Sequence, residues 1–254
     1  MLEALRRVKR VVKSVVASPR ERVYLSIRHH RKNEQLSGED FYRMDRGLQE
    51  YEDRLGKFDK VLDYVNRLGR VIVLDVGAGT TKAIKELEDL CHIKGLTNLS
   101  FMATVLTYGS KVREKIKGNL GLSRTLVTSA EVLRGVKAGS VGLLLSVWSI
   151  TYSADLKMVA ESFHRVLAPG GVLKVFFPKV DLRRKVENLV ENGVYISEGD
   201  KFVEYLELLG YDVSVSETQT NFGMVILAIK RGGVAKLSAN QLLVADLGDA
   251  LHQE

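Results

Sequence analysis

The chain has few of the residues that disulfide-stabilised domains, zinc sites and membrane spans require. Its 254 residues include one cysteine, Cys91, which excludes an intramolecular disulfide and a cysteine-based zinc site. No apolar run approaches the ~18 residues of a membrane-spanning helix. The five histidines show no metal-ligand spacing, so we expect no metal site. These absences favour a cytoplasmic protein.

The composition that remains fits one sizeable α/β domain with extensions. The net charge of +7 is unevenly distributed, because residues 1–34 hold ten Lys or Arg against three acids. Residues 2–16 place apolar side chains at helical spacing, which predicts an amphipathic helix ending before Pro19. Such a basic arm indicates an anionic partner, such as RNA, or a solvated helix without one. A membrane surface is a weaker alternative, and Glu3 and Glu21 argue against a targeting peptide.

The middle of the chain alternates between helical and strand-like patterns. Residues 41–68 predict a long surface helix or two consecutive ones, which Gly69 ends. Apolar runs rich in β-branched residues then predict strands over 71–76, 99–106, 141–147 and 172–177. Helical spacing lies between them over 80–90, 110–119 and 154–167. This alternation predicts right-handed crossovers and a parallel sheet.

The C-terminal part follows another pattern. A helix over 198–209 precedes two strands, 211–217 and 222–230, which only four residues join. A connection that short cannot hold a parallel crossover, so this pair is antiparallel. Residues 238–241 read as a capping box that opens a last helix, 239 to about 251. We therefore divide the chain into a helical extension over 1–40, a main domain over 41–232 and a C-terminal helix over 233–254.

A glycine-rich turn, Gly77-Ala78-Gly79, follows the first strand. A dinucleotide fingerprint needs a third glycine where Lys82 stands, and a phosphate-binding loop needs a Gly-Lys-Ser/Thr ending; both are absent. Asp75 would repel a pyrophosphate and suits an ammonium group such as that of S-adenosylmethionine. The alternative is that Asp75 caps the turn by accepting from nearby N–H groups.

Three segments carry a family resemblance. VIVLDVGAGTT over 71–81 resembles the first motif of class I S-adenosylmethionine-dependent methyltransferases. Residues 154–175 are similar to the helix, Pro-Gly-Gly turn and fifth strand of the small-molecule-type branch, and residues 128–133 resemble its adenine-flanking segment. The resemblance covers about residues 58–231. It implies a Rossmann-like, doubly wound, mostly parallel seven-stranded sheet with a terminal antiparallel hairpin.

The resemblance also implies a set of cofactor-binding residues. Asp75, Gly77 and Gly79 would hold the methionine end, and Ala78 and Thr80 would complete the turn. Near the adenine we expect Ser129, Ala130 and Glu131, and at the end of the fourth strand Ser146 and Trp148. For Glu131 the alternative is a helix-start carboxylate partnering Thr128. For Trp148 the alternative is packing.

Two positions depart from the family pattern. Thr81 replaces the third glycine of the motif. The second strand has no acid at its end to bind the ribose hydroxyls, and only Thr104, Thr107 or Tyr108 offers a hydrogen bond there. Losing a charge-assisted bidentate contact costs ~1–3 kcal/mol of affinity.

The catalytic residues are unknown from sequence. Methyl transfer from a sulfonium is a direct displacement that needs alignment and desolvation, and it needs a base only when the acceptor must lose a proton. Tyr152 is a weak candidate, and His164, on an apolar helix, is better explained as structural. We predict methyl transfer to an RNA-associated or small-molecule acceptor. The alternative is a non-catalytic scaffold on a degenerate methyltransferase fold.

Overall fold

The computed structural model describes residues 45–105, 110–150, 153, 155–178, 190–191, 194–195, 198–217, 223–232 and 238–248. The basic arm and the proposed 1–40 extension lie outside these residues, as do Thr107, Tyr108 and Tyr152. In the part of the chain that is described, no helix has the length and apolar character to cross a membrane.

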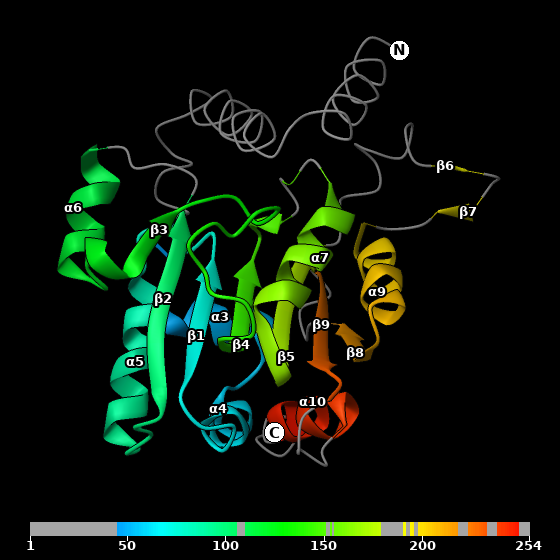
Figure 1. Cartoon of the computed structure of the whole chain (residues 1–254), viewed down its shortest axis with the longest axis horizontal. Coiled ribbons are helices and arrows are strands. Elements are labelled where there is room, and N and C mark those ends of the chain that lie inside the picture. Colours follow the sequence, from blue (N-terminus) through cyan, green and yellow to red (C-terminus); the bar gives the residue numbers. More distant parts are fainter. Residues whose placement is uncertain are drawn as a thin grey trace, which may run out of the picture.

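A seven-stranded sheet forms the centre of the molecule, with strand order β3-β2-β1-β4-β5-β9-β8 (Figure 1). Its strands are β1 (Val71–Val76), β2 (Leu99–Val105), β3 (Thr125–Val127), β4 (Val141–Val147), β5 (Leu167–Pro178), β8 (Tyr211–Glu217) and β9 (Gly223–Lys230). The first five strands pair in parallel, and β9 is antiparallel to both β5 and β8. This confirms the predicted mostly parallel sheet with a terminal hairpin. A separate pair, β6 (Val190–Glu191) and β7 (Val194–Tyr195), is antiparallel.

Two strands differ from the sequence prediction. β3 has three residues, too few for an apolar run to reveal, and was not predicted. β5 was predicted to begin at Val172, which is wrong, because it begins at Leu167. The ladder pairs Val141 with Leu167 and then Leu143 with Val172, so the Pro-Gly-Gly segment bulges out of register within the strand.

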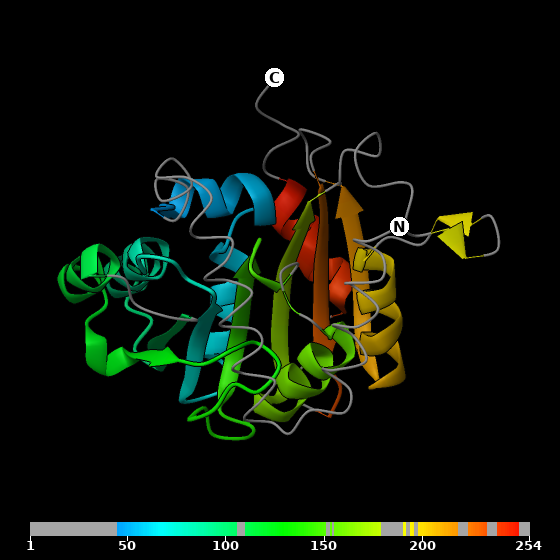
Figure 2. The same ribbon diagram turned by 90° about the horizontal axis from the view of Figure 1, so that it is seen from above.

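Helices cover both faces of the sheet (Figure 2). One core cluster joins the sheet to α3 (Leu48–Leu55), α4 (Asp59–Asn66), α5 (Lys82–Ile93) and α10 (Ala239–Gly248). The other joins it to α7 (Leu156–Val166) and α9 (Glu198–Leu208). Near the β3 edge of the sheet, α6 (Ser110–Gly118) and the 3₁₀ turn η2 (Leu122–Arg124) form a small cluster with the end of β2. Alternate residues of each central strand therefore face opposite helical layers.

Local signals explain where the helices begin and end. The predicted helical region before Gly69 is two helices, α3 and α4, with Gly56 at a φ of 77° between them. Asp155 caps α7 by accepting a hydrogen bond from Met158 N at 3.1 Å. The predicted capping box of α10 is confirmed, because Ser238 N donates to Gln241 Oε1 at 2.8 Å and Gln241 N to Ser238 Oγ at 3.3 Å.

A buried lysine fixes the position of α3 over the sheet. Lys174 of β5 is fully buried, and its Nζ donates to the carbonyl of Lys57, between α3 and α4, at 2.8 Å. The same ammonium lies 5.0 Å from the centre of the Phe58 ring. These contacts satisfy a charge inside the core and hold the C-terminal end of α3 against the sheet.

Candidate functional site

The glycine-rich turn lies where β1 passes into α5. Gly77 and Gly79 have φ of 77° and 58°, in the left-handed region. A Cβ on Gly77 would lie 2.1 Å from Ser149 Cβ, which no packing tolerates. Glycine at position 77 is therefore required by its conformation and by the approach of the segment after β4.

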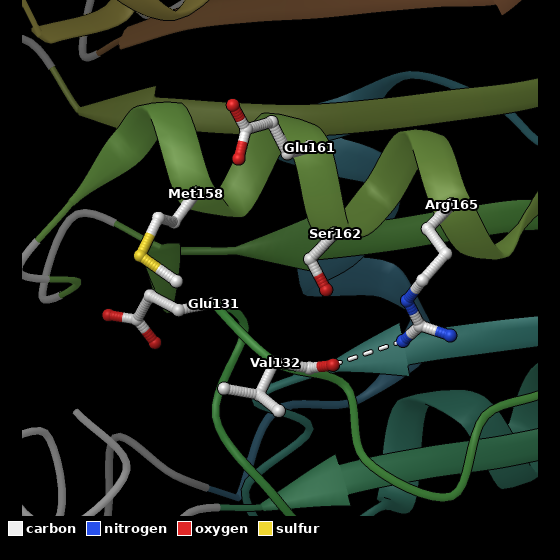
Figure 3. Close-up of a pocket in the computed structure, with 6 residues that line it drawn as sticks. All are labelled: Glu131, Val132, Met158, Glu161, Ser162 and Arg165. Atoms are coloured by element: carbon white, nitrogen blue, oxygen red, sulfur yellow. Dashed lines mark hydrogen bonds between the residues drawn. The ribbon is translucent and has the colours of Figure 1, made fainter. Parts of the chain in front are cut away.

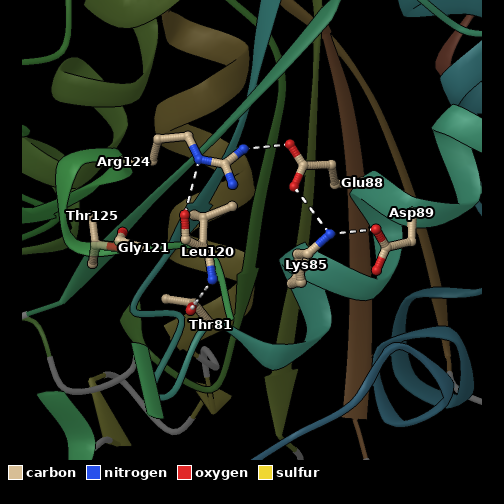
Figure 4. Close-up of polar contacts among 8 residues, drawn as sticks. All are labelled: Thr81, Lys85, Glu88, Asp89, Leu120, Gly121, Arg124 and Thr125. Atoms are coloured by element: carbon tan, nitrogen blue, oxygen red, sulfur yellow. Dashed lines mark hydrogen bonds and ion pairs between the residues drawn. The ribbon is translucent and has the colours of Figure 1, made fainter. Parts of the chain in front are cut away.

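Thr81 occupies the place of the missing third glycine. Its φ of 64° lies in the left-handed region, although it is a buried β-branched residue. Its Oγ1 accepts a hydrogen bond from Leu120 N at 3.4 Å, and nearby Arg124 pairs with Glu88 of α5 (Figure 4). The turn thus keeps the backbone that the motif requires while replacing the residue that adopts it most easily.

Asp75 is a strongly perturbed group at this edge of the sheet. Its side chain is fully buried, and Tyr51 of α3 donates to its Oδ2 at 2.8 Å. Its other oxygen, Oδ1, has no hydrogen-bond partner among the described residues. Burial raises the pKa of Asp75 to about 7, while the Tyr51 bond and the charge of Arg46 act in the opposite direction.

The structure does not support the interpretation that Asp75 caps the turn. The N–H groups of Gly77 and Ala78 both donate to the carbonyl of Thr104, each at 3.0 Å. Asp75 instead receives its hydrogen bond from Tyr51, which sequence reasoning did not single out. The helical spacing marks Tyr51 as a buried side chain, but nothing in the sequence names its partner.

Thr104, at the end of β2, accepts hydrogen bonds from the glycine turn. Its Oγ1 accepts from Gly77 N at 3.3 Å, in addition to the two bonds that its carbonyl accepts. The side chain is 1% exposed. Of the three residues predicted to replace the ribose-binding acid, Thr104 is the one that is described, and its hydroxyl already contacts the turn.

Thr80 binds the segment that precedes α3. Its Oγ1 donates to Asp45 Oδ1 at 2.7 Å, and Lys115 of α6 binds Asp45 Oδ2 at 2.5 Å. These hydrogen bonds and the charge of Lys115 hold the pKa of Asp45 below its usual value. The glycine turn, the start of α3 and α6 are therefore tied together by one carboxylate.

The segment predicted to flank the adenine is a turn that follows β3. Ser129 is 1% exposed, and its Oγ has no hydrogen-bond partner among the described residues. Thr128 Oγ1 accepts from Arg134 N at 2.8 Å, so the alternative in which Glu131 begins a helix beside Thr128 is wrong. Leu133 closes the turn at a φ of 43°. The predicted adenine contacts of Ser129, Ala130 and Glu131 stay predictions.

A pocket of about 260 Å³ opens between this turn and α7. It is lined by Glu131, Val132, Met158, Glu161, Ser162 and Arg165 (Figure 3). Arg165 donates to the carbonyls of Val132, Leu133 and Val136 at 3.0–3.1 Å, which fixes the turn on the helix. The pocket contains no residue of the glycine turn, and its arginine acts as a structural clamp.

The end of β4 contacts the end of β1. Ser146 Oγ lies 2.5 Å from Ser149 Oγ, and Ser149 donates to the carbonyl of Val76 at 2.5 Å. Trp148, between them, has a φ of 68°. The centre of the Trp148 ring lies 5.2 Å from that of Phe176 and 4.8 Å from the Arg54 guanidinium. Trp148 thus packs against Phe176 and Arg54, and its predicted place beside the cofactor stays a prediction.

His164 takes no part in this edge of the sheet. Its ring packs against Tyr211 with centres 5.5 Å apart, and its carbonyl accepts from Lys230 at 2.6 Å. Burial, with a smaller contribution from Lys230, lowers the pKa of His164. These contacts support the structural interpretation. The other candidate proton carrier, Tyr152, lies outside the described residues.

Comparison with known proteins agrees with this geometry. A family model described as a methyltransferase domain matches residues 74–175. Malonyl-[acyl-carrier protein] O-methyltransferase 1 of Coxiella burnetii (strain RSA 493 / Nine Mile phase I) is 31% identical over 112 residues, 44% of this chain and 35% of that protein. The match thus spans about a third of the length of that curated relative.

A solved structure shares the fold. The crystal structure of a SAM dependent methyltransferase from Aquifex aeolicus aligns with a TM-score of 0.51 at 18% identity, covering 76% of this chain and 98% of that chain. At that identity the match shows the architecture alone. The family match falls on β1 through β5, the strands whose carboxyl ends carry the residues described above.

Proposed function

Because residues 74–175 belong to the methyltransferase domain family and the sheet has its class I fold, we propose that this chain is an S-adenosylmethionine-dependent methyltransferase. S-Adenosylmethionine is the cofactor of that family. The observation that carries the proposal is the buried Oδ1 of Asp75, which lacks a hydrogen-bond partner among the described residues and lies just before the glycine turn. Buried polar groups almost always have a hydrogen-bond partner, so an unpaired carboxylate oxygen suits a site that a bound group completes.

The described residues fit the two ends of that cofactor. Asp75 offers a carboxylate oxygen to the ammonium of the methionine moiety, and the glycine turn follows it directly, with Gly77 and Gly79 at positive φ. The buried hydroxyl of Ser129 also lacks a partner among the described residues, and in the arrangement that the resemblance implies it would meet the adenine. Buried polar atoms without a hydrogen-bond partner among the described residues therefore occur within the set that was assigned to cofactor binding.

The bound cofactor would supply a methyl group on a sulfonium, which is already activated for displacement. The contribution of the protein is alignment and the exclusion of water rather than strong acid or base chemistry. The rigid contact between the ends of β1 and β4, through Ser149 and Val76, suits that role because it fixes the floor of the site.

Calorimetric titration tests the proposal. We expect S-adenosylmethionine to bind the native chain saturably and Asp75→Ala to weaken that binding by about tenfold or more, since a charge-assisted contact is lost. Arg70→Gln is the matched control, because this exposed residue precedes β1 at its amino end, the opposite edge of the sheet. Absence of saturable binding to the native chain would contradict the proposal and favour the non-catalytic scaffold.

A further inference from the structure

A cluster of Arg54, Trp148 and Phe176 lies where β4 and β5 end. Arg54 comes from α3, and its guanidinium lies 4.8 Å from the Trp148 ring centre and 5.3 Å from that of Phe176. Trp148 follows β4, and Phe176 lies near the carboxyl end of β5. The cluster therefore places a cation at the carboxyl edge of the sheet, beside the cofactor site.

The contacts of Arg54 hold its side chain in place but leave some of its hydrogen-bond donors without an acceptor among the described residues. Stacking on two rings orients the plane of a guanidinium and leaves its N–H groups to other partners. The buried Nε of Arg54 has no hydrogen-bond acceptor among the described residues. Among the described residues, Arg54 forms an ion pair from Nη2 to Glu50 at 3.5 Å, with side chains 27% and 39% exposed. Exposed pairs at this spacing contribute little, so Arg54 retains most of its capacity for an anion.

The backbone of the cluster supports a functional role. Trp148 has a φ of 68°, a conformation that a large side chain adopts only at a cost. Strained residues of this kind concentrate at binding sites, where the surrounding structure imposes the conformation. In this conformation the Trp148 ring centre lies 4.8 Å from the Arg54 guanidinium.

From this arrangement, and resting on the proposed methyltransferase function, we propose that Arg54 stacked on Trp148 binds the carboxylate of an acidic methyl acceptor. A guanidinium matches a carboxylate through two parallel hydrogen bonds. In the reaction, a carboxylate oxygen forms the new O–CH₃ bond while the CH₃–S bond breaks. The products are a methyl ester and S-adenosylhomocysteine, and no proton is released.

That stoichiometry agrees with the chemistry of the described site. A carboxylic acid is already ionised at neutral pH, so its methylation needs no general base. The hydroxyls at the end of β4, on Ser146 and Ser149, bind each other and the carbonyl of Val76. The described residues after β4, together with Arg54 of α3, thus offer packing and one cation, which suits a charged acceptor.

The single tryptophan of the chain, Trp148, provides a direct binding assay. Its fluorescence would be followed while acetate, monomethyl malonate, benzoate and decanoate are added in turn at constant ionic strength, with S-adenosylhomocysteine present. We expect a saturable change with at least one of these carboxylates. Dimethyl malonate, the neutral counterpart of monomethyl malonate, should give none. Inorganic phosphate is titrated in a separate experiment, and an equal response to phosphate would overturn the assignment to a carboxylate.

Two variants on α3 should move the affinity in opposite directions. Arg54→Gln should weaken carboxylate binding about tenfold or more. Glu50→Gln, which removes the competing carboxylate, should tighten it about twofold. Arg70→Gln removes the same charge at the opposite edge of the sheet and should leave the affinity unchanged. A purely structural arginine would lower stability in Arg54→Gln without any carboxylate response in the native chain, and that outcome would overturn the proposal.

Calorimetry with S-adenosylmethionine separates the two hypotheses. Normal cofactor binding without a carboxylate response overturns the acceptor site alone. Carboxylate binding without cofactor binding contradicts the methyltransferase function, and it overturns the acceptor role of Arg54 as well. Transfer of a radioactive methyl group to the carboxylate that binds, as a base-labile ester, would support both.

Discussion

The two ends of the proposed cofactor site differ in how their polar groups are used. At the methionine end, Asp75 is buried with one oxygen bound to Tyr51 and the other unpaired. At the ribose end, the hydroxyl and the carbonyl of Thr104 both accept hydrogen bonds from the glycine turn. The first end retains an unsatisfied acceptor for a ligand, whereas Thr104 at the second stabilises the protein itself. Affinity for the cofactor should therefore depend mainly on the methionine end.

The largest effect is expected from closing the glycine turn. Gly77→Ala places a methyl group 2.1 Å from Ser149 Cβ at a φ of 77°, so it should lower the free energy of unfolding by about 3 kcal/mol or more and abolish cofactor binding. Gly69→Ala is the matched control, because Gly69 also has a positive φ, 95°, but nothing lies within 4 Å of the added Cβ. It should cost about 1 kcal/mol. Chemical denaturation measures both, and equal losses would show that the contact with Ser149 is unimportant.

Protonation of Asp75 gives the next largest effect. An ammonium group prefers the ionised carboxylate, and the pKa of Asp75 is raised to about 7. Affinity for S-adenosylmethionine should therefore fall about tenfold for each pH unit below 7 and level off above it. Asp75→Asn should be nearly independent of pH. Tyr51→Phe should shift the profile to higher pH, because the Tyr51 bond lowers the pKa of Asp75. Calorimetry between pH 5.5 and 8.5, a range of about three units around that pKa, measures the profile, and a flat native profile would contradict the role of Asp75.

The raised pKa of Asp75 also determines how the stability of the folded chain changes with pH. The folded-state pKa of Asp75 lies above the ordinary aspartate value of 3.8, so between about pH 4 and pH 7 the folded chain binds a proton that the unfolded chain has released. The stability contributed by Asp75 is complete below this window and is lost as the pH rises through about 7. A bound ammonium reverses this loss, because it stabilises the ionised form.

The sequence predicted the frame of the fold and the methionine end of the site. The alternating patterns and the four-residue connection identified the parallel sheet and its antiparallel hairpin, because both follow from local periodicity. The sequence did not predict which side chains contact the residues of the site. Tyr51 meets Asp75 across 24 residues of sequence, and Arg54 meets Trp148 through the docking of α3 on the sheet. These contacts depend on tertiary packing, which local pattern does not encode.

A smaller effect should come from the ribose end. Thr104→Val removes the hydroxyl that accepts from Gly77 N at 3.3 Å, while the carbonyl of Thr104 continues to accept the same N–H at 3.0 Å. Stability should fall by about 0.5–1 kcal/mol, and cofactor affinity should change less than threefold. Thr125→Val, a buried threonine on the adjacent strand β3, is the control for loss of a hydroxyl. A tenfold loss of affinity in Thr104→Val alone would show that this hydroxyl binds the cofactor and that the two ends are alike.

The smallest effect should come from Thr81, whose conformation the turn imposes. A threonine at a φ of 64° carries a strain of ~1–2 kcal/mol, which glycine would remove. Thr81→Gly also loses a weak hydrogen bond from Leu120 N, at 3.4 Å, and gains conformational freedom in the unfolded chain. These effects nearly cancel, so we expect the stability to change by less than about 0.5 kcal/mol, with unchanged cofactor affinity. Thr81→Ala keeps the strain without the hydroxyl and should be the less stable of the two. If thermal denaturation finds it more stable, the freedom that glycine gains in the unfolded chain outweighs the strain, and the departure from the glycine motif has no structural cost.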